Sequence, residues 1–287
     1  METLEFDEDA ISWTTTTCNK PTCQLTGLTP ETGYLLQVRG DYGSDGKSEW
    51  ATTIFTTLKH IELADNADNS GLIAAANSET LDVTLTRTYS STATNWNTFC
   101  VPFDIDNTTL KAKFGDDVEV AEFSENSTDA DNITVSFTKM ADPVITANKP
   151  VLLKTSVAPA SVTFTGVTIK NAEPKVAGNY FDFVGSYEAQ KYVETGNYYL
   201  SANKLYRSSK DNGTYIKGLR AYIKAKTANA RVANFGINED VVTEVKGVKE
   251  VKEVNDDSWY TLDGVKLDKQ PTKKGMYIYN GRKTVIK

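Results

Sequence analysis

The sequence predicts an all-β fold made of antiparallel β-sandwich modules with a terminal β-meander. Three observations support this class. Apolar and polar residues alternate with a period of two through most of the chain, whereas the 3.6-residue period of an amphipathic helix is nearly absent. Threonine, tyrosine and valine are abundant, and their branched or aromatic side chains pack well on a pleated sheet. Hydrophobic residues make up 39% of the 287 residues, which is enough for a buried core.

Three segments show the alternation most clearly. Residues 81–85, 133–137 and 162–164 place apolar side chains at every second position, so each is expected to be a strand with one buried face. Such strands are typical of antiparallel sheets with one face in water. Residues 72–240 are therefore expected to form two packed antiparallel sheets, with less than about a tenth of these residues in helices.

One short helix is expected at residues 107–115. Asn107 or Thr108 would cap its start, and Gly115 would end it. Its length limits it to one or two turns.

Two polar segments divide the chain. Residues 63–71 form an Asp/Asn cluster after a strand-like segment, which places a boundary loop there and a domain boundary near residue 60. Residues 241–257 alternate Glu and Lys around valines spaced three apart, a pattern that suits neither a helix nor a strand, so they are expected to be an extended linker. The expected parts are 1–60, 61–240, 241–257 and 258–287.

Charge and composition exclude several function classes. With 31 basic and 38 acidic residues the net charge is −7, so nucleic acid is not expected as a partner. The single histidine, His60, excludes sites that need two imidazoles, and it is expected to be a solvated linker residue. The first residues are acidic, unlike a secretory leader, and the longest small apolar run, residues 71–76, is far shorter than the roughly 20 residues of a membrane span.

The three cysteines cannot all pair within one chain. For Cys18 and Cys23, separated by four residues, a disulfide across a hairpin and two free thiols are both open alternatives. Cys100 lies in the apolar stretch 99–103 and is expected to act as a small buried hydrophobe.

No catalytic, cofactor or metal site is assigned from the sequence, and the chain is not expected to be an enzyme. Nucleotide-binding loops and the serine-hydrolase elbow are missing from the sequence. Carboxylate pairs lie in polar segments and are expected to be solvated turns: Asp116 with Asp117, Asp129 with Asp131, and Asp256 with Asp257. Two groups offer oxygen ligands for calcium without the spacing of a recognised loop. They are Asp65, Asp68 and Asn69, and Asp41 with Asp45.

Tyrosines gather in one region of the chain, where exposed rings would stack on sugars. Because neighbouring residues of a strand face opposite sides, about half of these rings should instead be buried. The tyrosines are Tyr187, Tyr192, Tyr198, Tyr199, Tyr206 and Tyr215. A core role is favoured, and a carbohydrate-binding surface is the alternative.

The N-terminal part carries LTGLTPETGY at 25–34, then LLQVRGDYGSDGKSEW and IFTT. These residues, about 11–58, resemble the second half of a fibronectin type III domain. The resemblance implies a turn at Pro30, a core position for Leu28, a tyrosine corner at Tyr34, and Trp50 at the opening of the last strand. Only about four of that domain's seven strands fit, so the chain is expected to be the C-terminal part of a longer polypeptide.

The middle part carries WNTFCVPFDI at 96–105, KPVLLK at 149–154, GNYYLSANKLYRSS at 196–209 and KGLRAYIK at 217–224. Together these segments resemble a β-sandwich domain of secreted and surface proteins of the Bacteroidetes. Trp96, Phe99, Val101 and Phe103 are expected in the core, and Tyr222 and Ile223 in a strand. Arg220 is expected to be a buried or half-buried structural arginine that bonds carbonyls.

The last part, 259–287, resembles the C-terminal sorting domain of type IX secretion. Hairpin turns are expected at Asp263-Gly264 and Asn280-Gly281, and Gly275 should begin a third strand. The resemblance implies an extracellular or cell-surface location and the secretion machinery as a partner. The alternative is a terminal meander that docks on the preceding sandwich.

These expectations combine into one functional hypothesis. The chain would be a non-catalytic modular region of a secreted or surface-displayed bacterial protein, which spaces, presents and sorts an N-terminal functional part. The alternative is a carbohydrate- or protein-binding module that contacts an extracellular glycan or a host protein.

Overall fold

A computed structural model describes most of the chain, and it divides the chain into two units, Met1–Val245 and Lys246–Lys287. Strands account for 44% and helices for 8%, so the all-β prediction is confirmed. The described residues are 12–20, 22–89, 94–127, 133–209, 214–227, 230–237, 242–243, 259–260, 266–267, 269–272, 275–279 and 282–286.

The first strands of the chain form a two-stranded antiparallel sheet, β1 (Gly33–Val38) with β2 (Ala51–Thr56). The hydroxyl of Tyr34 accepts a hydrogen bond from the N–H of Thr29 at 2.7 Å, so the predicted fold-back of this tyrosine onto the turn is confirmed. Trp50 directly precedes β2, also as predicted. Leu28 is only half-buried, because so small a sheet encloses little volume.

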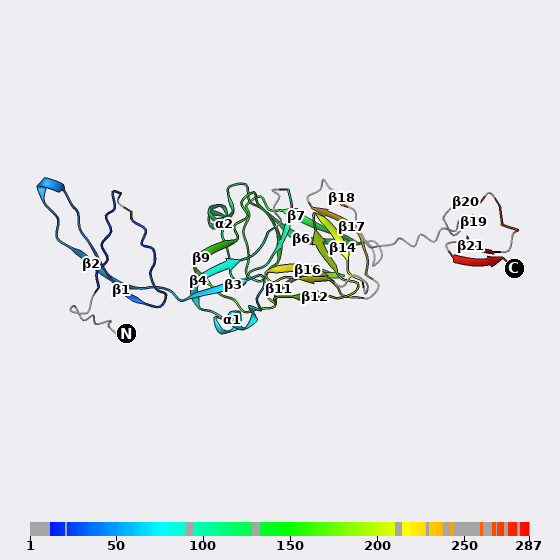
Figure 1. Cartoon of the computed structure of the whole chain (residues 1–287), viewed down its shortest axis with the longest axis horizontal. Helices are drawn as coiled ribbons and strands as arrows, with labels where there is room; N and C mark the ends of the chain where they lie inside the picture. The colour runs from blue at the N-terminus through cyan, green and yellow to red at the C-terminus, as the bar shows by residue number, and fades with distance from the viewer. Residues whose placement is uncertain are drawn as a thin grey trace. The chain divides into compact units, whose positions relative to one another are not determined.

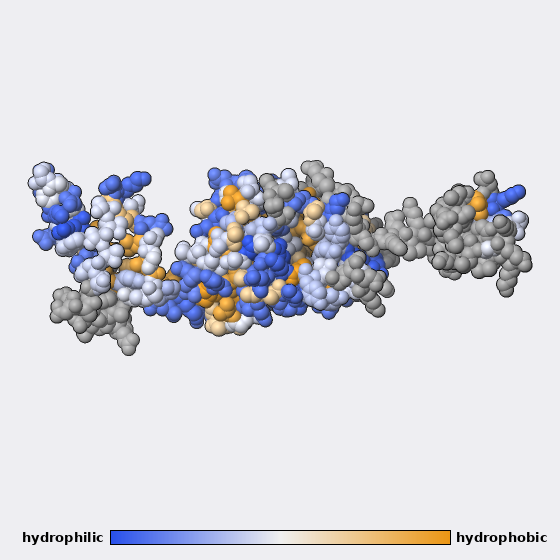
Figure 2. Space-filling view, viewed as in Figure 1, coloured by the Kyte–Doolittle hydropathy of each residue, from blue (hydrophilic) through white to orange (hydrophobic). Residues whose placement is uncertain are grey.

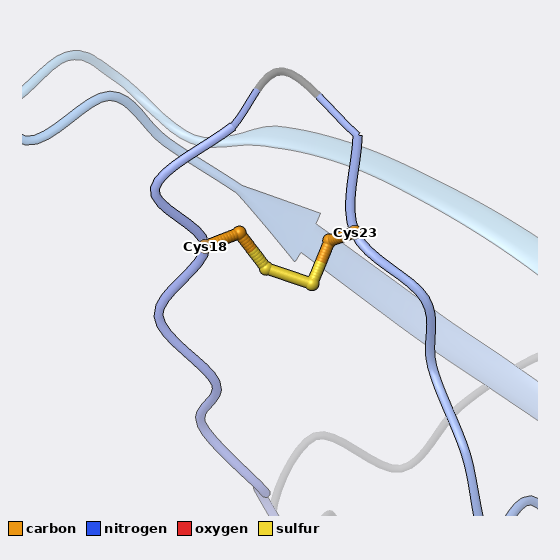
Figure 3. The surroundings of a disulfide bond; sticks show 2 residues. All are labelled: Cys18 and Cys23. Atoms are coloured by element: carbon orange, nitrogen blue, oxygen red, sulfur yellow. A yellow bond between two sulfur atoms is a disulfide. The ribbon is translucent and has the colours of Figure 1, made fainter.

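A disulfide joins Cys18 to Cys23, which decides between the two alternatives that the sequence leaves open (Figure 3). It closes a short irregular loop that precedes β1. A 3₁₀ turn, Gly43–Asp45, lies between β1 and β2.

A three-stranded sheet comes next, in the order β3-β4-β9 (Figure 1). β4 has the predicted alternation of buried and solvent-facing residues, as does β9. β3 and β4 run parallel, so the expectation of purely antiparallel pairing is wrong here. A short helix, α1, connects these two strands. The bounds are β3 His60–Ala64, α1 Ser70–Ala75, β4 Thr80–Thr86 and β9 Ser161–Thr168.

The polar segment 63–71 is not a solvated boundary loop. Leu63 is fully buried in β3, and Asp65 and Asn69 are buried polar residues. The cluster was misleading because its polar side chains bond to the folded chain rather than to water. His60 is exposed as predicted, but it begins a strand, and its Nε2 lies 2.9 Å from Thr84 Oγ1.

A six-stranded sheet has the order β18-β17-β7-β6-β8-β5. β7 alternates as predicted and pairs with β6 in antiparallel fashion, but it pairs with β17 in parallel, the second departure from the expected pairing. The bounds are β5 Asn97–Phe99, β6 Glu119–Ser127, β7 Ile133–Lys139, β8 Val151–Lys154, β17 Val232–Ile237 and β18 Val242–Thr243.

The predicted short helix is α2, Asn107–Phe114, and it ends at Gly115 as predicted. Its cap is Asp106, one residue before the predicted positions. A carboxylate oxygen of Asp106 accepts a hydrogen bond from the N–H of Thr109 at 2.7 Å. Leu110 and Phe114 are buried on the inner face of the helix.

A five-stranded sheet has the order β10-β11-β16-β13-β14, and a separate ribbon pairs β12 with β15. All of these pairs are antiparallel. The bounds are β10 Lys175–Ala177, β11 Phe181–Ser186, β12 Lys191–Val193, β13 Tyr198–Ser201, β14 Lys204–Arg207, β15 Thr214–Ile216 and β16 Arg220–Ala225.

Two hydrophobic cores lie in the first unit. One takes side chains from the three-stranded sheet, α1, α2, the segment after β5, and strands β5, β6 and β8 of the six-stranded sheet, with Leu63, Leu85, Phe103 and Phe164 among its members. The other takes side chains from both the six-stranded and the five-stranded sheet. In this core the ring centroids of Phe137 and Phe183 lie 5.1 Å apart. Side chains from two sheets sharing one core give a β-sandwich-like arrangement.

The C-terminal unit is a four-stranded antiparallel sheet in the order β20-β19-β21-β22. β21 begins at Gly275, as predicted, but it pairs with β19 rather than with β20, so the order is not that of a simple meander. Both expected turn pairs lie outside the described residues. The bounds are β19 Trp259–Tyr260, β20 Lys266–Leu267, β21 Gly275–Tyr279 and β22 Arg282–Ile286.

Most of the predicted linker, 241–257, lies outside the described residues. The exceptions are Val242 and Thr243, which form β18 and pair with β17, so the six-stranded sheet extends past the predicted end of the sandwich. The division between the two units follows Val245.

Candidate functional site

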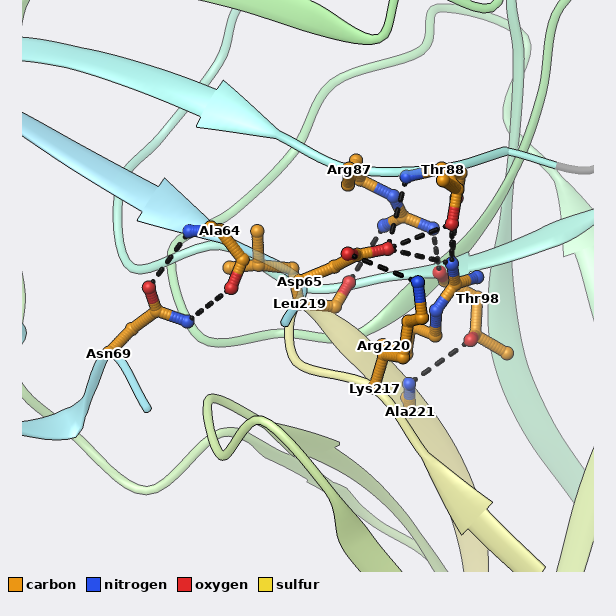
Figure 4. A network of polar contacts seen from close by, with 10 residues as sticks. All are labelled: Ala64, Asp65, Asn69, Arg87, Thr88, Thr98, Lys217, Leu219, Arg220 and Ala221. Carbon is orange, nitrogen blue, oxygen red and sulfur yellow. Dashed lines mark hydrogen bonds and ion pairs between the residues drawn. The ribbon is translucent and has the colours of Figure 1, made fainter. Parts of the chain in front are cut away.

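The most connected group of polar side chains lies where three strands meet (Figure 4). Asp65 directly follows β3, and Arg87 and Thr88 directly follow β4. Because β3 and β4 are parallel, the residues that follow them lie at the same end of the sheet, beyond the C-terminal ends of both strands. Lys217 precedes β16 and Arg220 begins it, so this strand brings two cations to the same end of the sheet.

Asp65 is the acceptor at the centre of this network. One carboxylate oxygen accepts hydrogen bonds from the N–H of Thr88 at 3.0 Å and from its hydroxyl at 2.9 Å. The same oxygen lies 3.1 Å from Arg220 Nη2, and the other lies 3.5 Å from Lys217 Nζ. Burial alone would raise the pKa of Asp65, but the Thr88 hydrogen bonds and the two cations outweigh it and lower the pKa. The carboxylate is therefore ionised at neutral pH.

Arg87 is completely buried. Its Nη1 donates to the carbonyl of Leu219 at 2.7 Å and its Nη2 to that of Thr98 at 3.1 Å. The guanidinium lies over the rings of Tyr89 and Phe99, with 4.4 Å and 5.1 Å to the ring centroids. Burial lowers its pKa to about 10, so it still carries its charge at neutral pH.

Leu219 shows how tightly the network holds the backbone. It adopts a φ of 60°, which is unfavourable for a bulky residue. Its carbonyl accepts hydrogen bonds from Arg87 and from the N–H of Cys100, and its own N–H donates to Ser186. These bonds hold a conformation that costs about 1–3 kcal/mol.

Arg220 has the role predicted from the sequence. Its Nη2 donates to the Thr88 carbonyl at 2.7 Å and to the Thr88 hydroxyl at 2.9 Å, in addition to the Asp65 ion pair. Its side chain is 21% exposed, so it is half-buried. Arg87 was missed, although a signal was present. Leu81, Val83 and Leu85 alternate inward, and the same alternation puts residue 87 on the buried side.

A second buried polar group lies around Cys100. The Tyr187 hydroxyl donates to the Asn148 side-chain oxygen at 2.7 Å and lies 3.6 Å from the Cys100 sulfur. Burial raises the pKa of Cys100 to about 12, so the thiol stays protonated and unreactive at neutral pH. The prediction that Cys100 is a small buried hydrophobe is confirmed.

The oxygen ligands considered for calcium do not converge. Asp65 points to the cations, whereas Asn69 points away from them and bonds to the backbone of Ala64, Ala67 and Tyr187 (Figure 4). Asp68 accepts a hydrogen bond from the N–H of Ser70. Among the described residues, no group of three or more His, Cys, Asp or Glu side chains is placed to hold a metal ion.

The other predicted acidic groups are also accounted for. Asp41 accepts a hydrogen bond from the N–H of Gly43 and forms an ion pair with Lys47 at 3.3 Å, while Asp45 contacts the hydroxyl of Ser44. Asp116 and Asp117 are exposed in the turn after α2, as predicted. Two pairs lie outside the described residues: Asp129 with Asp131, and Asp256 with Asp257.

The tyrosines divide as predicted between core and surface. Tyr187 and Tyr198 are buried, and Tyr199, the neighbour of Tyr198, faces the other side. Tyr199 stacks on Tyr206 across β13 and β14, with ring centroids 5.5 Å apart. A second pair on the β12–β15 ribbon is exposed. Tyr192 and Tyr215 are 39% and 62% exposed, and their ring centroids are 5.2 Å apart.

In chemical terms, the Asp65 network joins parts of the fold. Its donors point at backbone carbonyls and at one carboxylate, and so it ties the ends of β3 and β4, which belong to the first core, to β16, which belongs to the second. In the part of the chain that the structure describes, no helix is long and apolar enough to cross a membrane. No protein-family model matches the chain, and comparisons with curated proteins and with solved structures give no match.

Proposed function

We propose that the chain is a non-catalytic modular region of a secreted or cell-surface bacterial protein. Residues 12–245 space and present a functional part of the polypeptide, and the C-terminal unit sorts it. The observation that carries the proposal is the separate C-terminal unit, whose strands form a sheet of their own. A small separate sheet suits a segment that is read by export machinery, as the resemblance to type IX sorting domains implies.

Two further observations support the location and the spacing role. The Cys18–Cys23 disulfide fits an oxidising compartment, where such bonds persist. The Asp65 network joins the two cores, which suits a rigid spacer rather than two parts that hinge against each other.

A reporter fusion tests the sorting role. Residues 246–287 are fused to the C-terminus of a periplasm-directed fluorescent protein in a Bacteroidetes host that carries type IX secretion. The matched control carries residues 200–241 of this chain, an equally long β-rich segment. The proposal predicts cell-surface or medium fluorescence with the tail alone, and loss of it in a strain without the secretion channel. Equal periplasmic retention of both fusions would contradict the sorting role.

The exposed Tyr192–Tyr215 pair favours a second candidate, carbohydrate binding. Adjacent exposed rings offer the apolar faces on which sugar rings stack, and exposed aromatic pairs are unusual unless a partner covers them. A glycan array tests this candidate with Tyr215→Ala, and Tyr42→Ala serves as the control because Tyr42 is equally exposed in the connection between β1 and β2. Binding that is lost only in Tyr215→Ala supports it, and the absence of any glycan signal eliminates it.

A further inference from the structure

One edge of the three-stranded sheet is open. β4 lies between β3 and β9, and β9 has no strand on its outer side in the described part of the chain. β9 is eight residues long, and a strand edge of this length presents a row of N–H and C=O groups that can pair with another strand.

The hydrogen bonds of β4 show which of its groups point to β9. The N–H of Asp82 donates to Lys59 and the carbonyl of Thr86 accepts from Asp65, and both bonds lie on the β3 side. The two sides alternate along a strand. The odd-numbered residues 81–85 therefore direct their backbone groups to β9.

The register then gives the direction of each β9 residue. Val162, Phe164 and Val167 lie opposite the odd-numbered residues of β4, so their backbone groups are used in the sheet. Thr163 and Thr168 lie opposite even-numbered residues, and their N–H and C=O groups point away from β4, toward the open side.

Among the described residues, the position beside β9 is filled only beyond its C-terminal end. There the N–H of Lys170 donates to the carbonyl of Pro102 at 2.7 Å. The chain then turns away through Asp104 into α2 and leaves a groove of about 460 Å³ between α2 and residues 164–168. This volume is in the range of ligand-binding sites. On the face shown in Figure 2, hydrophobic residues form scattered patches among polar ones rather than one continuous band.

The lining of the groove suits an extended peptide. Ile105 and Phe164 are buried apolar residues beneath it, and Thr109, Ala112 and Lys113 line it from α2. The groove follows α2 from Thr108 to Lys113, six residues or about 9 Å, which a strand covers with about three residues.

The charges of the groove indicate which peptide fits. Asp104 forms an ion pair with Lys170, and the Asp106 carboxylate caps α2. Lys113 lines the other end and has no ion-pair partner among the described residues. Both carboxylates of the lining are thus bonded within the chain, whereas Lys113 has neither a hydrogen bond nor an ion pair among the described residues, and a peptide carboxylate would complement its charge.

We propose that this groove binds an extended peptide segment of another protein, which adds a strand to β9 and places a carboxylate against Lys113. Main-chain pairing with Thr163 and Thr168 supplies the affinity, and the apolar floor with Lys113 supplies the selectivity. This inference is independent of the sorting and carbohydrate roles.

Amide hydrogen exchange of the free protein tests the open edge. The amides of Val162, Phe164 and Val167 should exchange about 100-fold more slowly than those of Thr163 and Thr168, because only the first three are bonded within the sheet. Equal protection of all five would show that the edge is already paired and would overturn the proposal.

A phage-displayed library of random octapeptides tests the groove itself, with the full chain as bait. Ala112→Trp fills the groove, and Lys111→Trp is the matched control because it places the same side chain on an exposed part of the same helix outside the lining. We expect acidic, β-branched peptides to be enriched on the unmodified chain and on Lys111→Trp, but not on Ala112→Trp. Absence of enrichment, or equal enrichment on Ala112→Trp, would overturn the proposal.

A synthetic copy of the most enriched peptide completes the test. Lys113→Glu should weaken its binding about fivefold or more, and methylation of alternate backbone nitrogens in the peptide should abolish binding. Bound peptide should also slow the exchange of the Thr163 and Thr168 amides. Binding that survives N-methylation, or that leaves these two amides unprotected, would show that the peptide does not add to the sheet.

Discussion

Replacing Asp65 by asparagine tests the network that joins the two cores. The carboxylate accepts two hydrogen bonds from Thr88 and pairs with Arg220 and Lys217. Removing one partner of a buried ion pair costs about 3–5 kcal/mol. Lys217 is 49% exposed and Arg220 is 21% exposed, so both regain water when the carboxylate is lost, and asparagine keeps one acceptor for Thr88. We therefore expect a loss of about 2–3 kcal/mol at pH 7.

The cost of Asp65→Asn should depend on pH, because only the unmodified chain has a carboxylate at this position. The pKa of Asp65 is lowered below its usual 3.8 in the folded chain. A lowered pKa contributes stability above the pKa of the unfolded chain, and this contribution is lost as the pH falls through the folded pKa. Asparagine has no such contribution at any pH. The difference in unfolding free energy between the two chains should therefore shrink as the pH falls from 7 toward 3.

The assay is urea unfolding at both pH values, and Asp116→Asn serves as the control because Asp116 is exposed in a turn. The control should change the free energy of unfolding by less than about 0.5 kcal/mol. A cost below about 0.5 kcal/mol for Asp65→Asn, or a cost that is the same at both pH values, would refute the reasoning.

Three further predictions follow from particular contacts. Arg87→Ala should cost at least about 3 kcal/mol in urea unfolding, because it removes one hydrogen bond from each of two buried carbonyls and leaves a cavity between aromatic rings; a cost under 1 kcal/mol would contradict the assigned contacts. Cys100 should resist a thiol-alkylating reagent in the native chain and react fully in urea, and fast native labelling at pH 7 would show that the thiol is accessible. Tyr34→Phe should destabilise the β1–β2 sheet by about 1 kcal/mol through loss of the bond from Thr29, measured by tryptophan fluorescence during unfolding; unchanged unfolding would mean that the hydroxyl contributes nothing.

The sequence predicts strands and their buried faces well because alternation is a local signal. In β4 and β7, each apolar residue of the pattern is buried. The same signal does not identify a strand's partners, so the parallel pairs β3–β4 and β7–β17 were unforeseen. Alternation describes one strand, whereas pairing depends on the whole chain.

The candidate site was harder to predict because its bonds join distant residues. Asp65 and Asn69 lie in a segment that reads as a polar loop, yet Asp65 pairs with Arg220 and Asn69 bonds to the Tyr187 carbonyl, both more than 100 residues away. Arg220 was predicted as a structural residue because the several N–H donors of a guanidinium suit bonds to backbone carbonyls. The short helix α1 was missed because its small residues give little contrast between apolar and polar faces.

The independence of the C-terminal unit is the central claim, and thermal denaturation of two chains tests it directly. One chain ends at Val245 and the other at Lys287. Neither hydrophobic core contains a residue of the C-terminal unit among the described residues, so the melting temperatures of the first unit should agree within about 2 °C. A drop of more than about 5 °C in the shorter chain, which corresponds to more than about 1 kcal/mol, would contradict the claim and show that the tail supports the fold.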